Sequence, residues 1–193
     1  MAGLKIAIVC FVAMADISCG ATVANVPEPT TAVVIETAAP TTEAPRAEIP
    51  TAPKSEGFVA YSIYGITPPI DWQQYLYEQL NSLGFGWYMP YAVGQIFQES
   101  RWDQYSDNGV DVGLTQQKAV YWQTRAAHWG VPGASIWDPY AQLHVYAGMM
   151  CQFLTQTGSV EWALSLYFWG NGDYAPKYIA DVMSHLGALE VVR

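Results

Sequence analysis

Cysteine is scarce in this sequence, which has three cysteines among 193 residues. Cys10 and Cys19 lie near the N-terminus, and Cys151 is the only one after residue 57. A disulfide framework within that later part is therefore excluded. Cys151 lies among apolar residues at helical spacing, so we expect a small core side chain there rather than a nucleophile.

Basic residues are scarce as well, since eight Lys and Arg stand against seventeen Asp and Glu, for a formal net charge of −9. No stripe of positive charge could meet phosphates, so nucleic acid is not expected as a partner. The three histidines, His128, His144 and His185, lack the spacing of a metal site. We expect neither a metal ion nor another cofactor.

Aromatic residues are nearly absent before residue 57, where Phe11 stands alone. The same part begins with Lys5, an apolar run over residues 6–15 and small residues around Cys19, which predicts an export signal over residues 1–23. Three fates remain open: the signal is removed, it is retained as a membrane tether, or Cys19 is lipidated and forms the tether. Each predicts an exported protein of the periplasm or cell envelope.

Residues 24–56 are rich in Pro, Thr, Ala and Glu and hold six of the twelve prolines. Such a segment cannot bury enough apolar surface to offset its ordering entropy, so we expect a disordered linker. It is either a tether that holds a catalyst near an extended polymer or a spacer of unselected length. Residues 57–193 remain as the folded domain, which we expect to be a monomer.

Apolar periodicity within this domain predicts helices and almost no strands. Asp71 follows two prolines and can cap a first helix, and Asp138-Pro139 is a typical helix start. The repeated spacings of three and four predict an all-α fold. The expected helices cover residues 71–84, 90–102, 117–129, 138–154, 160–168 and 176–186.

The second expected helix carries a carboxylic acid near its end. Ala92, Ile96 and Glu99 share one face, which we expect to be the buried one. Partial desolvation would raise the pKa of Glu99 and keep the group protonated near neutrality, as a general acid requires. The alternatives are a solvated glutamate at a helix end and a structural partner for Arg101.

A glycine-rich turn follows this acid. Asp107-Asn108-Gly109 is a turn signal, and Gly113 permits close approach of the backbone beside Gln116. Such a loop can form the wall of a sugar cleft, where an amide side chain offers both a donor and an acceptor to a hydroxyl or an N-acetyl group.

These motifs resemble, in order, those of the soluble lytic transglycosylase (SLT) family, whose lysozyme-like domain carries Glu-Ser, Ser-x-x-Gly and Gly-Leu-Met-Gln. The matching positions are Glu99-Ser100, residues 106–109 and residues 113–116. Residues 138–142 and 163–170 resemble the family's Asp-Pro helix start and its Ala-Leu-x-x-Tyr-Asn-x-Gly segment. The resemblance implies a lysozyme-like transglycosylase domain.

Some positions depart from the family pattern. Thr115 stands where the family prefers Met, and Phe168 stands where it prefers Asn. The spacing from Ser106 to Gly113 is one residue longer than in the commonest form. Asp111, just before Val112-Gly113-Leu114, resembles a pattern of hydrolytic lysozymes instead.

The resemblance implies that Glu99 is the catalytic acid of a peptidoglycan lytic transglycosylase, with the glycan strand as its partner. Glu99 would protonate the oxygen between N-acetylmuramic acid and N-acetylglucosamine, then act as base on the muramoyl 6-hydroxyl, so that a 1,6-anhydro ring forms. Ser106, Gln116 and Tyr167 resemble positions that bind the substrate or orient the acid. Aromatic side chains near these segments are expected to stack on sugars, and Trp102, Tyr105 and Trp169 are the candidates.

Two alternatives stay open. A lysozyme-type muramidase would need a second carboxylate to hold water or attack the sugar, and Asp103, Asp107 and Asp111 are the candidates. A non-catalytic protein of lysozyme fold would bind glycan or serve as a structural part of an envelope or virion machine.

Overall fold

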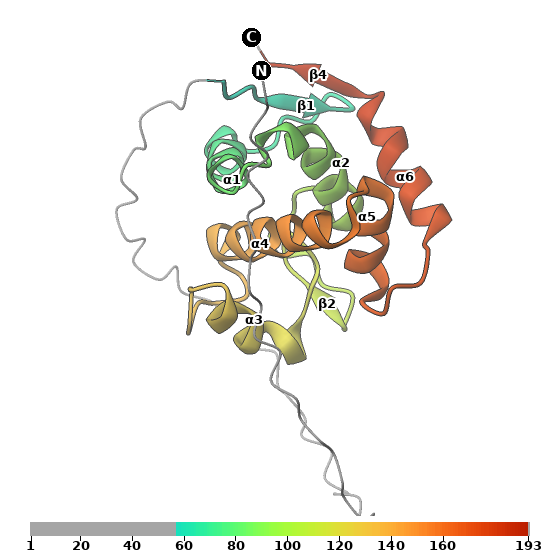
Figure 1. Cartoon of the computed structure of the whole chain (residues 1–193). Coiled ribbons are helices and arrows are strands. Elements are labelled where there is room, and N and C mark those ends of the chain that lie inside the picture. The colour runs from blue at the N-terminus through green and yellow to red at the C-terminus, as the bar shows by residue number, and fades with distance from the viewer. Residues whose placement is uncertain (1–56, 193) are drawn as a thin grey trace, which may run out of the picture. The chain divides into compact units, whose positions relative to one another are not determined.

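The computed structural model describes residues 57–192, which are mostly helical (Figure 1). This confirms the predicted all-α class. The predicted export signal and linker lie outside the described residues. The α helices are α1 (Ile70–Ser82), α2 (Met89–Ser100), α3 (Trp122–His128), α4 (Pro139–Thr157), α5 (Val160–Trp169) and α6 (Pro176–Leu186). Two 3-10 turns, η1 (Gly86–Tyr88) and η2 (Ala119–Tyr121), lead into α2 and α3.

Within residues 57–192, four short strands form two separate antiparallel pairs. β1 (Tyr61–Ile63) pairs with β4 (Leu189–Val191), so the two ends of the described chain lie side by side (Figure 1). β2 (Asp111–Val112) pairs with β3 (Gln117–Lys118) in a small hairpin. This second pair holds the glycine-rich turn in place after α2.

The ends of the helices follow the sequence signals only in part. Asp138 caps α4 as predicted, because its carboxylate accepts hydrogen bonds from the backbone N–H groups of Tyr140 and Ala141, at 2.9 and 3.4 Å. Asp71 is not the cap of α1, since the helix begins one residue earlier and places Asp71 in its first turn. There its carboxylate accepts a 2.7 Å hydrogen bond from the Tyr140 hydroxyl of α4.

The expected third helix begins later than predicted. Gln117 and Lys118 form β3 instead, and a 3-10 turn intervenes before α3 starts at Trp122. Pairing of Gln117 with Val112 of β2 draws this segment into the hairpin. This hairpin pairing overrides the local helix propensity.

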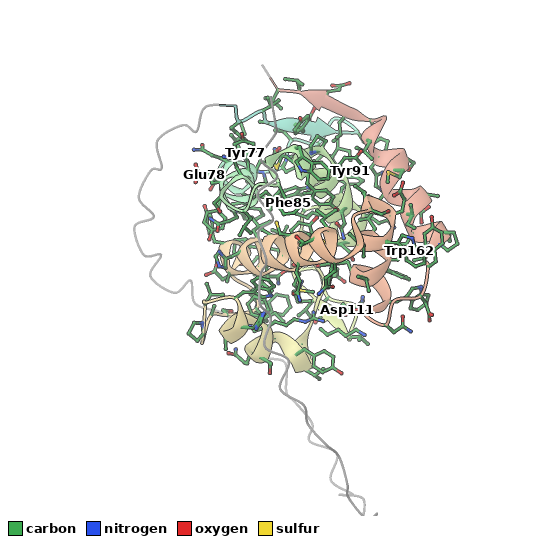
Figure 2. The ribbon with its side chains drawn as sticks, viewed as in Figure 1. Tyr77, Glu78, Phe85, Tyr91, Asp111 and Trp162 are labelled. Atoms are coloured by element: carbon green, nitrogen blue, oxygen red, sulfur yellow. The ribbon has the colours of Figure 1, made fainter. Side chains whose placement is uncertain are left out.

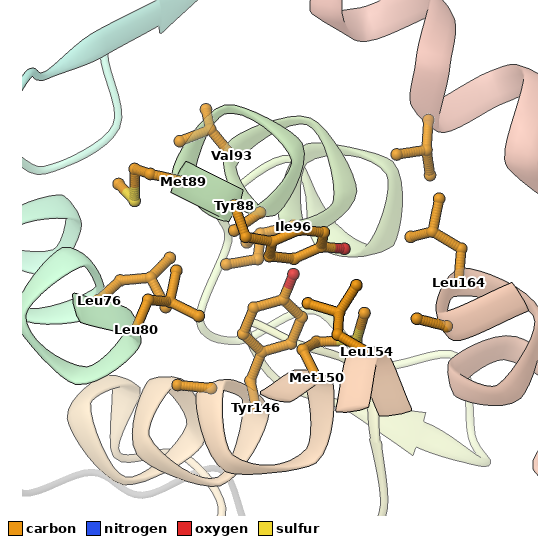
Figure 3. Packing of buried hydrophobic residues seen from close by; sticks show 14 of the residues in the cluster. Leu76, Leu80, Tyr88, Met89, Val93, Ile96, Tyr146, Met150, Leu154 and Leu164 are labelled. Carbon is orange, nitrogen blue, oxygen red and sulfur yellow. The ribbon is translucent and has the colours of Figure 1, made fainter. Parts of the chain in front are cut away.

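The main core lies between α1, α2, α4, α5 and α6, where side chains fill the space between the helices (Figure 2). Figure 3 shows this packing, in which Leu76, Ile96, Met150 and Leu164 are fully buried. Burying each of these side chains stabilises the fold by roughly 1.5–3 kcal/mol. Cys151 is also buried here, as expected. Within residues 57–192, no helix combines the length and the apolar character that crossing a membrane requires.

Candidate active site

Glu99 lies in the last turn of α2, where the helix leaves the core. Ala92 and Ile96 on the same face are fully buried, which confirms the predicted stripe, and the Glu99 side chain is itself partly buried. The hydroxyl of Tyr178 in α6 donates a hydrogen bond to Glu99 Oε1. Within the described residues no ion pair joins Glu99 to Arg101. Neither a solvated helix-end glutamate nor an arginine partner describes this group.

The surroundings of Glu99 favour its neutral form. Burial raises its pKa from 4.5 to about 7. The hydrogen bond from Tyr178 acts in the opposite direction and lowers the pKa, whereas the negative charge of Asp111 raises it. A carboxyl group that titrates near neutrality can both give and take a proton at physiological pH, as general acid–base catalysis requires.

The chain turns sharply just after the acid. Arg101 and Trp102 both adopt left-handed backbone conformations, with φ of 56° and 66°. Each costs about 1–2 kcal/mol in a residue with a side chain. The turn is held by the Trp102 indole, which donates to the carbonyl of Val93 at 3.3 Å, and by the Ser100 hydroxyl, which donates to the carbonyl of Leu114 at 2.6 Å. The glycine-rich segment is thereby brought back against the end of α2.

Gly113 sits at the tightest point of this segment. Its N–H donates to the Ser106 carbonyl at 2.7 Å, and its φ is 78°. A Cβ atom there would stand 1.7 Å from Nε2 of Gln142, so only glycine fits. Oε1 of the same Gln142, in α4, accepts hydrogen bonds from the backbone N–H and the hydroxyl of Thr115, at 2.7 and 3.0 Å. Helix α4 therefore fixes the turn.

Gln116, in the turn of the hairpin, and Ser106, in the segment before β2, are two of the predicted substrate-binding residues and lie together. Gln116 Nε2 donates to the carbonyls of Ser106 and Gly113, at 3.2 and 3.0 Å, and Oε1 accepts from Asn108 at 3.1 Å. The Gln116 amide thus holds the loop together. Within the described part of the chain, the Ser106 hydroxyl makes no hydrogen bond, so it is the group of this pair that a sugar could engage without breaking a loop contact.

Tyr167 of α5, the third predicted residue, also lies against the turn. Its hydroxyl donates to the Thr115 carbonyl at 2.5 Å and accepts from Gln117 Nε2 at 2.8 Å, and Arg125 donates to Gln117 Oε1 at 2.8 Å. Burial is the main cause that raises the pKa of Tyr167, and the charge of Glu99 is the next. The structure therefore brings Tyr167 and Glu99 close to each other.

Tyr167 also borders a cavity of about 340 Å³. Arg125 and His128 of α3 and Phe153 of α4 form other parts of its wall. The cavity is mixed in character, with two basic side chains beside apolar ones, and Tyr167 links it to the surroundings of Glu99.

The three predicted stacking residues differ in exposure. Trp102 is 6% exposed and belongs to the main core, so the prediction that its ring stacks on a sugar is wrong for this conformation. Tyr105 and Trp169 are 62% and 52% exposed. The neighbouring Phe168 stacks on the ring of Tyr178, with centroids 4.6 Å apart. Trp169 is therefore connected, through Phe168, to Tyr178, the hydrogen-bond partner of Glu99.

The candidates for a second carboxylate also differ in their surroundings. Asp103 and Asp107 lie on the surface and accept hydrogen bonds from backbone N–H groups two residues further on, which is the geometry of local turns. Asp111, labelled in Figure 2, is the one whose charge acts on Glu99. Of the three candidates, Asp111 is thus the one that the structure places near enough to influence Glu99.

Three glutamines that were not predicted as site residues support the site. Gln95, Gln117 and Gln142 are almost completely buried, and each bonds a group that contacts Glu99 or the turn beside it. A polar residue on the core face of an amphipathic helix is the sequence signal that could have identified Gln95 and Gln142. No such signal exists for Gln117, which lies outside the helices.

No group of three or more His, Cys, Asp or Glu side chains that could hold a metal ion occurs within residues 57–192. Burial raises the pKa of Cys151 to about 11, so the thiol is not activated as a nucleophile.

Comparisons with protein-family models, with curated proteins and with solved structures gave no match for the chain.

Proposed function

We propose that this chain is an exported lytic transglycosylase with a lysozyme-like fold, which cleaves the β-1,4 bond between N-acetylmuramic acid and N-acetylglucosamine in peptidoglycan. The observation that carries the proposal is a carboxylic acid at the end of α2, with a pKa of about 7, held against a glycine-rich hairpin. The resemblance of the motifs around Glu99, Gly113 and Tyr167 to the SLT family supports the same activity.

The reaction needs one group that works first as an acid and then as a base. Protonated Glu99 gives its proton to the glycosidic oxygen while the bond from that oxygen to C1 of the muramoyl residue breaks. The ionised Glu99 then takes the proton of the muramoyl 6-hydroxyl, and O6 forms the new bond to C1. One C–O bond replaces another and Glu99 regains its proton, so neither water nor a second carboxylate takes part.

Tyr178 supports both halves of this cycle. Its hydroxyl donates to Glu99 Oε1, which stabilises the ionised acid after the first proton transfer. Burial acts in the opposite direction and restores the proton at the end. The balance between the two keeps the group able to cycle near neutral pH.

Export to the cell envelope is proposed from the pattern of residues 1–23 and, for a tether, of residues 24–56, all outside the described part of the chain. Access to peptidoglycan requires this location, so the proposed signal and the proposed activity agree.

A muramidase that uses water is the second candidate, and one observation favours it. Asp111 lies close enough to Glu99 for its charge to raise the pKa of the acid. In inverting and retaining glycosidases, a second carboxylate activates water or attacks the sugar. Asp111 is the residue that would do so here.

The test is a product analysis with the full-length protein on purified peptidoglycan, alongside a Glu99→Gln variant. Mass spectrometry should detect fragments that end in 1,6-anhydromuramic acid with the wild type and none with the variant. Glutamine keeps the size of the side chain and its capacity to accept from Tyr178, so glycan binding should persist. Fragments with a reducing-end muramic acid would instead identify the hydrolase. If the wild type released no fragments, the function that remains would be glycan binding or a structural role.

A further inference from the structure

Gln95 is a fully buried side chain one turn before Glu99 in α2. Its amide contacts three tyrosine hydroxyls from three parts of the chain. Oε1 accepts from Tyr88 at 3.0 Å and from Tyr146 of α4 at 2.7 Å, and Nε2 donates to Tyr178 of α6 at 3.1 Å. Figure 3 shows Tyr88 and Tyr146 in the middle of the core, with the Tyr146 hydroxyl directed toward the Tyr88 ring.

These hydrogen bonds all run in one direction. An ionised carboxylate can only accept, so the Tyr178 hydroxyl must donate its proton to Glu99 Oε1. That hydroxyl then accepts from Gln95, and an amide nitrogen can only donate. Tyr88 and Tyr146 both donate to Oε1 and so satisfy the amide oxygen in this orientation, whereas the reversed amide would place that oxygen against a Tyr178 hydroxyl whose proton is already donated to Glu99.

When Glu99 is neutral, the same hydrogen bonds determine which of its oxygens carries the proton. With Gln95 Nε2 on its lone pair, Tyr178 remains a donor to Oε1 when Glu99 is protonated, so the carboxyl proton sits on the other oxygen. Within the described residues no hydrogen bond reaches Glu99 Oε2. The proton is therefore held on the oxygen without a partner in the protein.

We propose that Gln95 is a positioning residue, which holds Tyr178 as a donor to Oε1 of Glu99 and so confines the acidic proton to Oε2, where it meets the glycosidic oxygen. The inference rests on the proposed function of Glu99. Tyr88 and Tyr146 act one step further back, by fixing the orientation of the amide.

The same protein also contains a buried glutamine whose role is purely structural. Gln73 of α1 is also fully buried, and its amide bonds the backbone of Tyr61 and the carbonyl of Pro68. Those partners belong to the N-terminal part of the domain. Gln95 differs because its partners are side-chain hydroxyls and their chain ends at the acid. Gln73 is therefore the matched control.

The expected effect of Gln95→Met is an upward shift in the pH at which Glu99 titrates. Without the amide, the Tyr178 hydroxyl can accept the proton of neutral Glu99 and so stabilise the neutral form. The other titratable groups that face Glu99 are Tyr167 of α5 and Asp111 of β2, and the substitution leaves both in place. We expect a shift of roughly half a pH unit or more.

The experiment is a carbon-13 NMR titration of full-length protein labelled at the glutamate side-chain carboxyl, with the Glu99 signal assigned by its loss in Glu99→Gln. Gln95→Met should raise the midpoint of that signal, and Gln73→Met should leave it at the wild-type value. An unchanged midpoint in Gln95→Met overturns the inference. Should that variant fail to fold, Tyr88→Phe/Tyr146→Phe, which releases the amide, must shift the midpoint in the same direction.

The titration does not depend on activity, so the two proposals can fail separately. Cleavage of peptidoglycan by the wild type together with an unmoved midpoint would overturn the positioning role alone. In the cleavage assay, the alkaline limb of the pH profile of Gln95→Met should follow the NMR midpoint upward, whereas a limb that stays in place argues against the inference.

Discussion

The Ser100 hydroxyl donates a 2.6 Å hydrogen bond to the carbonyl oxygen of Leu114, which joins the end of α2 to the turn of the hairpin. Both residues are buried. Ser100 therefore anchors the loop that faces Glu99: the first residue of the Glu99-Ser100 pair carries the partly buried carboxyl group, and the second positions the loop beside it.

We expect Ser100→Ala to destabilise the fold by about 1–3 kcal/mol, since the buried Leu114 carbonyl loses its donor. Chemical unfolding measures this cost. Ser82→Ala is the control, because the Ser82 hydroxyl donates to the Gln79 carbonyl at an exposed helix end and its loss should cost within about 0.5 kcal/mol. Equal costs in the two variants would argue against the anchoring role.

Gly113 should tolerate no side chain. In Gly113→Ala the new Cβ would stand 1.7 Å from Nε2 of Gln142, in addition to the strain of a φ of 78°. A loss of roughly 3 kcal/mol or more is expected in thermal or urea unfolding. Gly109→Ala provides the comparison, because its φ of 86° is similar and nothing lies within 4 Å of the added atom. That variant should lose about 1–2 kcal/mol, from backbone strain alone.

The left-handed residue after the acid offers a way to stabilise the protein. Arg101 is exposed and has a φ of 56°, a conformation that glycine adopts without steric cost. Arg101→Gly should therefore raise the free energy of unfolding by about 1 kcal/mol. Arg101→Ala removes the same side chain and keeps the strain, so it should show no such gain. A gain of equal size in both variants would mean that the arginine side chain, not the backbone, is the source.

Local patterns in the sequence were sufficient to predict most helices. Residues 176–186 and 160–168 were expected to be helical, and α6 and α5 follow those limits closely. The prediction failed at residue 117, where the backbone pairs with Val112 and the side chain bonds Tyr167. The first is a short-range hairpin contact and the second is a long-range one, and neither is visible in the periodicity of apolar residues.

The candidate site, too, could be predicted from the sequence only in part. Periodicity placed Glu99 on a buried stripe, and burial of that stripe raises its pKa. The roles of Gln116 and Trp102 could not be predicted, because both depend on backbone turns with positive φ. Those turns direct the Gln116 amide into its own loop and the Trp102 ring into the core.

Asp111→Asn separates the two candidate reactions. Because the charge of Asp111 raises the pKa of Glu99, its removal should lower that pKa, and the alkaline limb of the cleavage profile should move to lower pH. A transglycosylase would still release 1,6-anhydro products at acidic pH. A hydrolase that uses Asp111 would lose its activity at every pH. Asp107→Asn, in the exposed turn, should alter neither the limb nor the products.

Ionisation of the partly buried Glu99 side chain should weaken the fold. The folded pKa of Glu99 is about 7, against an ordinary 4.5. The stability held by its neutral form is complete below pH 4.5 and is lost as the pH rises through about 7. Glu99→Gln, which stays neutral, should be as stable as the wild type near pH 4, and its free energy of unfolding should be larger by up to about 3 kcal/mol at pH 8.

Glu161→Gln is the control: a hydrogen bond from Ser159 lowers the pKa of Glu161, so loss of this carboxylate should bring no gain in stability at pH 8. Urea unfolding of the three proteins at both pH values decides the matter. A constant difference between Glu99→Gln and the wild type across this range would show that Glu99 ionises as an ordinary surface carboxylate, and the proposed acid would lose its physical basis.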